Sequence, residues 1–370
     1  MMETSWYLIE DIDKLDSPAL VIFPERVKAN INTLKAMIDD PQRLRPHAKT
    51  HKTKEATQLM LAAGITKFKC ATIAEAEMLG LSGASDVVLA YQPIGPKLKR
   101  FVRVTQQYPN TQYSCLVDNI ASAEAIANAF AAVGDAVPVY IDLNIGQNRT
   151  GIVPGEKAIA LYEYCAMARS LSIAGLHAYD GHVRGTLAER TAQSNEAFAK
   201  VEDMLKALQS KGYTNVKVIA GGSPSFPIHA NRAAVECSPG TFVFWDKSYQ
   251  DQCTEQPFQI AAIVVTRVVS LPNDTHICVD LGHKSIAAEN EITKRVFFLN
   301  APELKAVSHS EEHLVLHAGE GHSYKPGDVL YGVPIHVCPT VALHERGYTV
   351  ENGKLAGEWR IIARDRKISL

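Results

Sequence analysis

The feature of this sequence that most restricts its fold is the alternation of short apolar runs with helical stretches between residues 43 and 237. Extended runs are predicted at 43–48, 68–71, 87–91, 113–117, 137–143, 173–178, 216–220 and 234–237. Helices are predicted between most of them, for example at 74–81, 97–106, 121–131, 157–168 and 187–209. Alternating strands and helices indicate a parallel sheet, and eight strands favour a closed (β/α)8 barrel of the TIM type. The alternative is an open doubly wound sheet, but no GxGxxG motif opens the first unit.

The chain changes in character after about Trp245. Short β-type runs are predicted at 258–271, 276–281, 295–299, 313–317, 329–333, 341–344 and 359–363. Turn residues separate these runs, and no long helical period appears. We therefore expect a barrel over residues 24–247 and a mostly β domain over residues 248–370. Residues 1–23 are expected to add one strand, at 17–23, to the β domain.

Charge and composition exclude several classes of partner. The formal net charge is −2 at pH 7, which gives no electrostatic argument for binding nucleic acid or an anionic membrane. No run is long and apolar enough to span a bilayer. The start of the chain lacks the basic head and apolar stretch of a signal peptide, and the seven cysteines show no CxxC spacing. We therefore expect a cytoplasmic protein with free thiols.

Polar residues are concentrated where the predicted strands end, which is where chemistry occurs in such barrels. The first strand ends at Lys49, within a basic segment that also holds His47. Arg149 follows the fifth strand, and His177 and Tyr179 end the sixth. Taken alone, the basic segment would suit a surface loop, Tyr179 a packing role and Arg149 a surface salt bridge.

The loops after the seventh and eighth strands have the composition of a phosphate site. Glycines let backbone N–H groups approach a phosphate closely, and serine or threonine hydroxyls complete the cradle. The residues that meet this need are Gly221, Gly222, Ser223, Gly240 and Thr241. Plain turns are the alternative, but these two loops are the usual phosphate position in a barrel. A phosphate site facing a lysine across a barrel mouth indicates pyridoxal phosphate (PLP), held by the lysine as a Schiff base.

These residues belong to a longer series of motifs. In chain order they are 45–52 (RPHAKTHK), 70–72 (CAT) with Glu75 and Glu77, Asp142 with 149–151 (RTG), 175–182 (GLHAYDGH), 221–224 (GGSP), 239–242 (PGTF), 310–313 (SEEH) and 334–340 (PIHVCPT). The series spans nearly the whole chain. It resembles the D-serine dehydratase and D-threonine aldolase family of fold-type III PLP enzymes, whose barrel is similar to the N-terminal domain of alanine racemase.

The resemblance implies roles for individual residues. Lys49, rather than Lys52 or Lys54, is implied as the Schiff-base lysine and the catalytic residue. His47 is counted with the residues that bind the cofactor, as are the glycine and hydroxyl residues of the two loops. Two further contacts are weaker inferences: His177 and Tyr179 with the cofactor ring, and Arg149 with the cofactor hydroxyl or a carboxylate.

A divalent metal is also implied by the resemblance. Family members bind it through a His-x-Cys or His-x-Asp pair in the β domain, which maps here to His336 and Cys338. A histidine and a cysteine two apart on a β-strand would point to the same side, and thiolate with imidazole suits zinc. Two protein ligands leave positions for water and substrate. Aspartate at the second position is typical of the aldolase branch, so Cys338 favours the dehydratase branch.

The resemblance thus implies a metal-assisted, PLP-dependent lyase whose partner is a small-molecule D-β-hydroxy amino acid. We expect a D-serine dehydratase-like reaction that gives a keto acid and ammonia. The alternatives are D-threonine aldolase-type cleavage to glycine and an aldehyde, an amino-acid racemase, and a non-catalytic PLP-binding protein. A racemase usually needs no metal, and small PLP-binding proteins of this barrel type typically lack a second domain. A homodimer is also implied.

Overall fold

The computed structural model describes residues 6–370 and divides into two compact units that interleave along the chain. The barrel unit comprises Leu34–Lys49, Thr57–Gly240 and Asp365–Leu370. The β unit comprises the residues up to Thr33, together with Thr50–Ala56 and Thr241–Arg364. The boundary expected near residue 247 stays a prediction. The expectation that the chain starts without a signal peptide concerns residues 1–5, which lie outside the described residues. Within residues 6–370, no helix is both long enough and apolar enough to cross a membrane.

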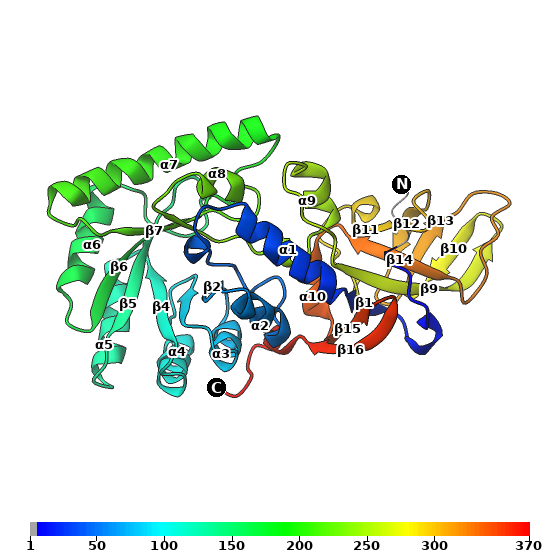
Figure 1. Ribbon diagram of the computed structural model, residues 1–370, viewed down its shortest axis with the longest axis horizontal. Coiled ribbons are helices and arrows are strands. Elements are labelled where there is room, and N and C mark those ends of the chain that lie inside the picture. The colour runs from blue at the N-terminus through cyan, green and yellow to red at the C-terminus, as the bar shows by residue number, and fades with distance from the viewer. Residues whose placement is uncertain (1–5) are drawn as a thin grey trace. The chain divides into compact units, whose positions relative to one another are not determined.

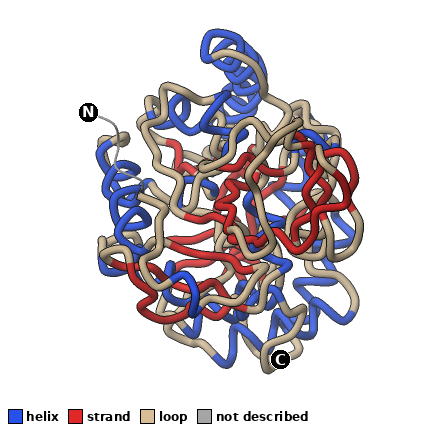
Figure 2. The backbone as a smooth tube through the Cα atoms, turned by 90° about the vertical axis from the view of Figure 1, so that its right-hand side faces the viewer, coloured by secondary structure: helices blue, strands red, loops and turns tan. Residues whose placement is uncertain are grey.

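A seven-stranded parallel sheet forms the wall of the barrel unit, with the strand order β2-β3-β4-β5-β6-β7-β8 (Figure 1). The strands are β2 (Lys67–Cys70), β3 (Asp86–Leu89), β4 (Gln112–Val117), β5 (Val137–Asp142), β6 (Leu171–Ala178), β7 (Lys217–Ala220) and β8 (Val235–Cys237). The helices that join them are α3 (Ile73–Leu81), α4 (Pro96–Gln107), α5 (Ile120–Ala131), α6 (Glu156–Met167), α7 (Leu187–Ser210) and α8 (Phe226–Ala230). Figure 2 shows the backbone coloured by secondary structure, with helices in blue and strands in red.

The extended segment 44–48 closes the gap between β8 and β2. Its backbone bonds alternately to the two edges. The N–H of Arg45 donates to the carbonyl of Cys237 at 2.8 Å, whereas the carbonyl of Pro46 accepts from the N–H of Lys69 at 2.9 Å. Only isolated bridges result, because Pro46 has no N–H to extend the ladder. The strand expected at 43–48 therefore exists as a bridging segment, and it starts one residue later because a 3-10 helix precedes it.

Polar side chains fix the starts of the barrel helices. The hydroxyl of Thr72 accepts from the backbone of α3, and the side chain of Asn119 accepts from the backbone of α5. Thr186 and Glu189 form a reciprocal capping box at the start of α7. Four strands contribute apolar side chains that pack together, namely Val88, Leu116, Tyr140 and Ile219.

A mostly antiparallel sheet builds the β unit, in the order β12-β13-β10-β9-β1-β15-β16, with β14 paired to both β9 and β11. The strands are β1 (Ala19–Ile22), β9 (Ala262–Asn273), β10 (His276–Val279), β11 (Val296–Phe298), β12 (Lys305–His309), β13 (Leu314–His317), β14 (Val329–Pro334), β15 (Arg346–Glu351) and β16 (Lys354–Arg360). The strand β1 lies between β9 and β15. A parallel α/β barrel followed by a mostly β part confirms the fold class predicted from the sequence.

The remaining helices correct one prediction. They are α1 (Pro24–Ala36), α2 (Lys54–Ala62), α9 (Lys247–Gln252) and α10 (Val337–Leu343). The β-type run expected at 341–344 is wrong, because most of it forms the end of α10. A helix of two turns is too short for its apolar spacing to be distinguished from that of a strand.

A charged cluster ties the amino-terminal ends of the barrel strands together. Arg45 is fully buried, and its guanidinium donates to both carboxylate oxygens of Asp86 at 2.7 and 2.8 Å. Its Nε donates to Glu236 at 2.7 Å, and the amine of Lys67 donates to the other oxygen of Glu236 at 2.6 Å. Two cations and two carboxylates thus link the closing segment to β2, β3 and β8. The two cations and the two carboxylates neutralise one another. This pairing stabilises the fold, since a buried charge without a partner is costly.

We predict that Arg45→Met lowers the free energy of unfolding of the barrel unit by about 3 kcal/mol, because Asp86 loses its bidentate partner and Glu236 keeps only Lys67. Urea unfolding followed by far-ultraviolet circular dichroism measures the change. The control is Lys206→Met, which removes an exposed ion pair with Asp203 and should change stability by less than about 0.5 kcal/mol. A loss below about 1 kcal/mol for Arg45→Met would contradict a structural role for the cluster.

Candidate active site

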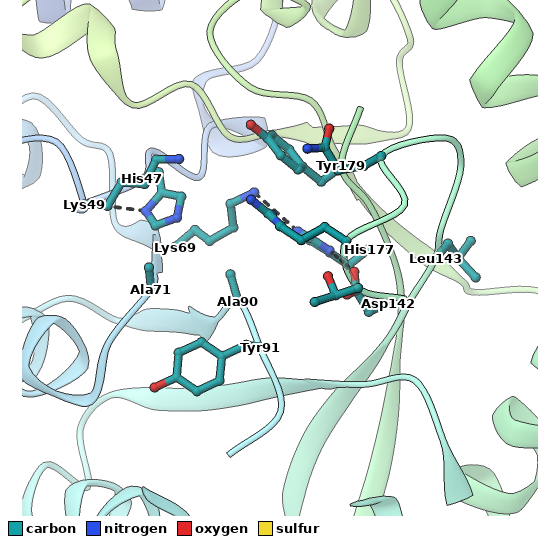
Figure 3. Close-up of a pocket in the computed structure, with 13 residues that line it drawn as sticks. His47, Lys49, Lys69, Ala71, Ala90, Tyr91, Asp142, Leu143, His177 and Tyr179 are labelled. Carbon is teal, nitrogen blue, oxygen red and sulfur yellow. Dashed lines mark hydrogen bonds and ion pairs between the residues drawn. The ribbon is translucent and has the colours of Figure 1, made fainter. Parts of the chain in front are cut away.

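A pocket of about 300 Å³ opens at the strand ends of the barrel unit (Figure 3). This volume is at the lower end of the range usual for small-molecule sites, roughly 300–1,000 Å³. Five residues predicted as site residues line it, namely His47, Lys49, Arg149, His177 and Tyr179. Four polar residues for which the sequence analysis gave no role also line it, namely Lys69, Asp142, Gln147 and Thr150. The structure therefore brings together the predicted residues from the first, fifth and sixth strand positions.

Lys49 lies in the turn that follows the closing segment, and its side chain faces the pocket. Its Nζ is 6.0 Å from the centroid of the Tyr179 ring. The backbone N–H of Lys49 donates to Nδ1 of His47 at 3.2 Å, so His47 helps to fix the turn that carries the lysine. An exposed amine on a fixed turn can react with a carbonyl group of a ligand in the pocket.

A second lysine lies deeper in the same pocket. Lys69 on β2 extends toward His177 on β6, and its Nζ is 3.3 Å from Nε2 of that ring (Figure 3). The other ring nitrogen, Nδ1, is 2.7 Å from Oδ1 of Asp142 on β5. All three side chains are buried, with exposed fractions of 3 to 6 %. The result is a continuous chain of hydrogen bonds from a carboxylate to a pocket amine.

Burial sets the ionisation of this chain. It lowers the pKa of Lys69 to about 7, and the positive charge of Lys49 acts in the same direction. Burial also lowers the pKa of His177, against the opposing effect of Asp142. For Asp142, burial would raise the pKa, but hydrogen bonds from His177 and Thr150 outweigh it and the pKa is lowered. At neutral pH, therefore, Asp142 is a carboxylate, His177 is neutral and Lys69 exchanges its proton readily.

Arg149 comes from the loop after β5, which side-chain hydrogen bonds hold in place. Asp118 at the end of β4 accepts from the N–H of Gly151 at 3.0 Å, and Asn144 accepts from the N–H of Asn148 at 3.1 Å. The guanidinium carbon of Arg149 lies 5.4 Å from the centroid of the Tyr179 ring. The loop thus presents a fixed cation to the pocket, suited to a carboxylate or a phenolate oxygen.

The predicted phosphate cradle is largely assembled within the barrel unit. The N–H of Gly240 donates to the hydroxyl of Ser223 at 3.3 Å, so the loops after β7 and β8 meet. Gly221 has φ of +76°, which favours glycine, and a Cβ on Gly222 would lie 3.1 Å from the ring of Tyr179. The fifth cradle residue, Thr241, belongs by its contacts to the β unit.

A buried polar network fixes the loop after β7. Asp180 accepts a hydrogen bond from the hydroxyl of Ser225 at 2.7 Å, and its other oxygen lies 2.8 Å from Nε2 of His229. Ser225 in turn accepts from the N–H of Gly222 at 3.2 Å. Burial would raise the pKa of Asp180, but its hydrogen bonds with His229, Ser225 and Ser194 outweigh burial and lower it. The carboxylate of Asp180 therefore orients the glycine loop through Ser225.

These residues fit PLP. The Tyr179 ring limits the space at the glycine loop, since a Cβ at Gly222 would lie 3.1 Å from it, closer than ordinary van der Waals contact. The same pocket offers the amine of Lys49 for a Schiff base and the cation of Arg149 for an anionic oxygen. The hydroxyl of Ser223 lies in the loop where a phosphate would be held.

His336 and Cys338 lie in the β unit, but not on a strand as the sequence analysis expected. β14 ends at Pro334, His336 immediately precedes α10, and Cys338 lies in the first helical turn. The argument from strand alternation is therefore wrong. Burial would lower the pKa of His336, but its interactions with Cys338 and Glu289 outweigh burial and raise it to about 9, so the Cys338 thiol lies near the imidazole.

The surroundings of this pair fit an open metal site. Nδ1 of His336 lies 2.5 Å from a carboxylate oxygen of Glu289, as is usual for metal-binding histidines. The hydroxyls of Thr50 and Thr241 lie 3.2 and 3.9 Å from Sγ of Cys338. Over residues 6–370, no three His, Cys, Asp or Glu side chains are grouped as a complete ligand set. His336 and Cys338 themselves offer one imidazole nitrogen and one thiol, which are donors that zinc accepts.

Sequence reasoning missed Lys69 and the network around Asp180. Lys69 lies inside a run that was assigned to a strand for its apolar neighbours, Phe68 and Cys70. A lysine in the interior of a buried parallel strand is rare without a partner, and this was the available signal. Asp180 and His229 are far apart in sequence, and only the fold brings them together.

Comparison with known proteins places these features in a family. The model of the family described as "Alanine racemase, N-terminal domain" matches residues 22–247, and that described as "Putative serine dehydratase domain" matches residues 261–350. The D-threonine aldolase of Arthrobacter sp. is 27% identical over 362 residues, covering 96% of this chain and 94% of the relative. The D-threo-3-hydroxyaspartate dehydratase of Delftia sp. (strain HT23) is 27% identical over 242 residues, covering 63% of this chain and 62% of the relative.

A solved structure agrees. The crystal structure of D-threonine aldolase from Filomicrobium marinum has a TM-score of 0.87 and 27% sequence identity, covering 94% of this chain and 95% of that chain. The first family match alone extends over more than half of the chain. The chain therefore belongs to the alanine racemase N-terminal domain family and, within it, to the D-serine dehydratase and D-threonine aldolase group of fold-type III PLP-dependent lyases.

Proposed function

We propose that this protein is a metal-assisted, PLP-dependent lyase that dehydrates a D-β-hydroxy amino acid of the D-serine type to a keto acid and ammonia. The observation that carries this proposal is the placement of His336 and Cys338 at the start of α10, where a carboxylate oxygen of Glu289 lies 2.5 Å from Nδ1 of His336. A thiolate and an imidazole together suit zinc, and zinc is a Lewis acid toward oxygen. Dehydration needs such help, because hydroxide is a poor leaving group.

The barrel pocket supplies the groups for PLP. Lys49 would hold the cofactor as a Schiff base, Gly221, Gly222, Ser223 and Gly240 its phosphate, and Arg149 its hydroxyl oxygen or the substrate carboxylate. Bound in this way, PLP draws electron density away from Cα of an attached amino acid. The amine of Lys49 would be the base placed to take a proton from Cα. Tyr179 contributes a ring surface that excludes water from one side of the site.

Retro-aldol cleavage is the second candidate, and a specific observation favours it. Two proteins matched over nearly the full chain are D-threonine aldolases, the relative from Arthrobacter sp. and the solved structure from Filomicrobium marinum. The same residues can serve this reaction, in which the β-hydroxyl loses its proton and Cα gains one.

A homodimer is also part of this proposal, and sedimentation velocity can test it.

The products formed from two substrates test the proposal. We predict that the holoenzyme converts D-serine to pyruvate and ammonia, and that dipicolinate abolishes this turnover until zinc is restored. Glycine and acetaldehyde from D-threonine, without pyruvate from D-serine, would move the protein to the aldolase function. L-serine as the main product would indicate a racemase, and turnover unaffected by chelation would remove the metal from the reaction.

The role of Lys49 has its own test. We predict that Lys49→Ala lacks the visible absorbance of a PLP Schiff base, and that borohydride no longer fixes the cofactor to the chain. Its kcat should fall by about 10³-fold or more, since the base and the attachment point are lost together. The matched control is Lys54→Ala, at the start of α2, which should keep the absorbance. Persistence of the absorbance in Lys49→Ala would show that another lysine holds PLP.

The metal pair can be tested without turnover. We predict that His336→Ala and Cys338→Ala each lose the bound zinc, measured by mass spectrometry of the metal, while the visible PLP absorbance remains. Cys278→Ala removes another thiol of the β unit and should keep the metal. Wild-type zinc content in both pair variants would exclude this pair as the site.

A further inference from the structure

The position of Lys69 is not explained by the proposed roles of the other pocket residues. Its amine lines the pocket, yet it lies inside β2, where the parallel sheet is otherwise buried. Its amine makes a hydrogen-bond contact with the imidazole of His177, at 3.3 Å, rather than with a carboxylate. An amine placed in this way costs desolvation free energy, which a purely structural role would not repay.

The hydrogen bonds define the direction in which protons can move. Asp142 can only accept, so Nδ1 of His177 carries the hydrogen between them. In the neutral ring, Nε2 then has a lone pair and accepts from Lys69. If Nε2 takes that proton, the imidazolium that forms is stabilised by Asp142 at 2.7 Å. The chain Lys69–His177–Asp142 can therefore store a proton or return it.

We propose that Lys69 is a second acid–base amine of this site, separate from Lys49, and that His177 and Asp142 act as its proton relay. This inference rests on the proposed function. Both candidate reactions move one proton between Cα and the β-oxygen of the substrate. In dehydration, the Cα–H and Cβ–O bonds break, a carbon–carbon double bond forms, and water leaves. In retro-aldol cleavage, the O–H and Cα–Cβ bonds break, an aldehyde forms, and Cα gains a proton.

Such a transfer needs two acid–base groups, one at Cα of the substrate and one at its β-oxygen. Lys49 handles the proton at Cα, and Lys69 handles the proton at the β-oxygen. Both amines line the same pocket, and their Nζ atoms lie 6.0 and 5.5 Å from the centroid of the Tyr179 ring. The burial that holds the pKa of Lys69 near neutrality suits this exchange.

Several charged or titratable groups surround Lys69 and must be separated from it in any pH experiment. Lys49, Arg45 and His47 face it from the closing segment, and Asp142 faces it from β5. Three groups face it from β6 and the end of that strand, namely His177, Tyr179 and Asp180. Arg149 faces it from the loop after β5, and Tyr91 faces it from the end of β3. Of the variants below, only Lys69→Met should remove the spectral titration in the neutral range.

The direction of the pH dependence follows from the reaction. In dehydration, Lys69 must be protonated to give a proton to the leaving oxygen, so kcat falls as pH rises through its pKa. In retro-aldol cleavage, Lys69 must be neutral to accept the hydroxyl proton, so kcat rises through the same range. The anionic groups of bound PLP favour the protonated amine, which places this limb in the neutral to mildly alkaline range.

The test uses the holoenzyme and two variants. We predict that the visible spectrum of wild-type PLP enzyme, without substrate, titrates in the neutral to mildly alkaline range, and that Lys69→Met loses this transition while retaining one PLP per chain. The corresponding limb of kcat should disappear, and kcat should fall by about 10²-fold with little change in KM. The control is Lys217→Met, at the exposed start of β7, which should behave as wild type.

His177→Gln keeps the proposal testable if Lys69→Met does not fold. Glutamine can donate to Asp142 and accept from Lys69, but it cannot carry the proton. We expect the spectral transition to remain and kcat to fall by about 10-fold or more. Wild-type kcat and pH dependence in this variant, or a wild-type spectral titration in folded Lys69→Met, would overturn the relay. A wild-type holoenzyme inactive on both substrates would instead overturn the proposed function, and the spectral titration would still decide the ionisation of Lys69.

Discussion

The chemistry of the barrel unit depends on how the segment 44–48 is held between β8 and β2. Its backbone bonds to both edges, so it cannot slide along either strand without breaking bonds to the other. In an extended chain, alternate residues point to the same side. The register that buries Arg45 in its ion cluster therefore also directs His47 and Lys49 to the pocket. A shift by one residue would exchange the two sides, turning Pro46 and Ala48 toward the positions of Arg45 and His47 and removing the reactive amine from the site.

The two ends of the barrel differ in charge balance, and this difference separates stability from function. At the amino-terminal ends of the strands, Arg45 and Lys67 are matched by Asp86 and Glu236. At the pocket, three cationic side chains line the cavity with one carboxylate, and that carboxylate is engaged by His177. A cavity with excess positive charge is costly without an anion and gains from binding one. The asymmetry thus favours a ligand with phosphate and carboxylate groups.

Much of this could be predicted from the sequence, because the barrel repeats one simple pattern. The parallel strands and the helices of the barrel were found close to their observed bounds, since period and strand length are local properties. The prediction failed where local signals are short or misleading. Val341 and Leu343 suggested a strand but belong to α10, and the strands β12 and β15 have few apolar residues to identify them. Lys69 was missed because its role arises from His177, more than a hundred residues away.

The proposed metal pair and the proposed proton relay depend on local geometry to different degrees. His336 and Cys338 were selected from the resemblance to a family whose members bind a metal through a His-x-Cys or His-x-Asp pair, and the strand expected beneath them is absent. The relay instead depends on geometry at each step. The Thr150 hydroxyl bonds to Asp142, Asp142 fixes the tautomer of His177, and that tautomer leaves a lone pair for Lys69. Because Thr150 adjoins Arg149, the loop that presents the pocket cation also supports the carboxylate behind the relay. A change in that loop would therefore act on both ligand binding and proton transfer.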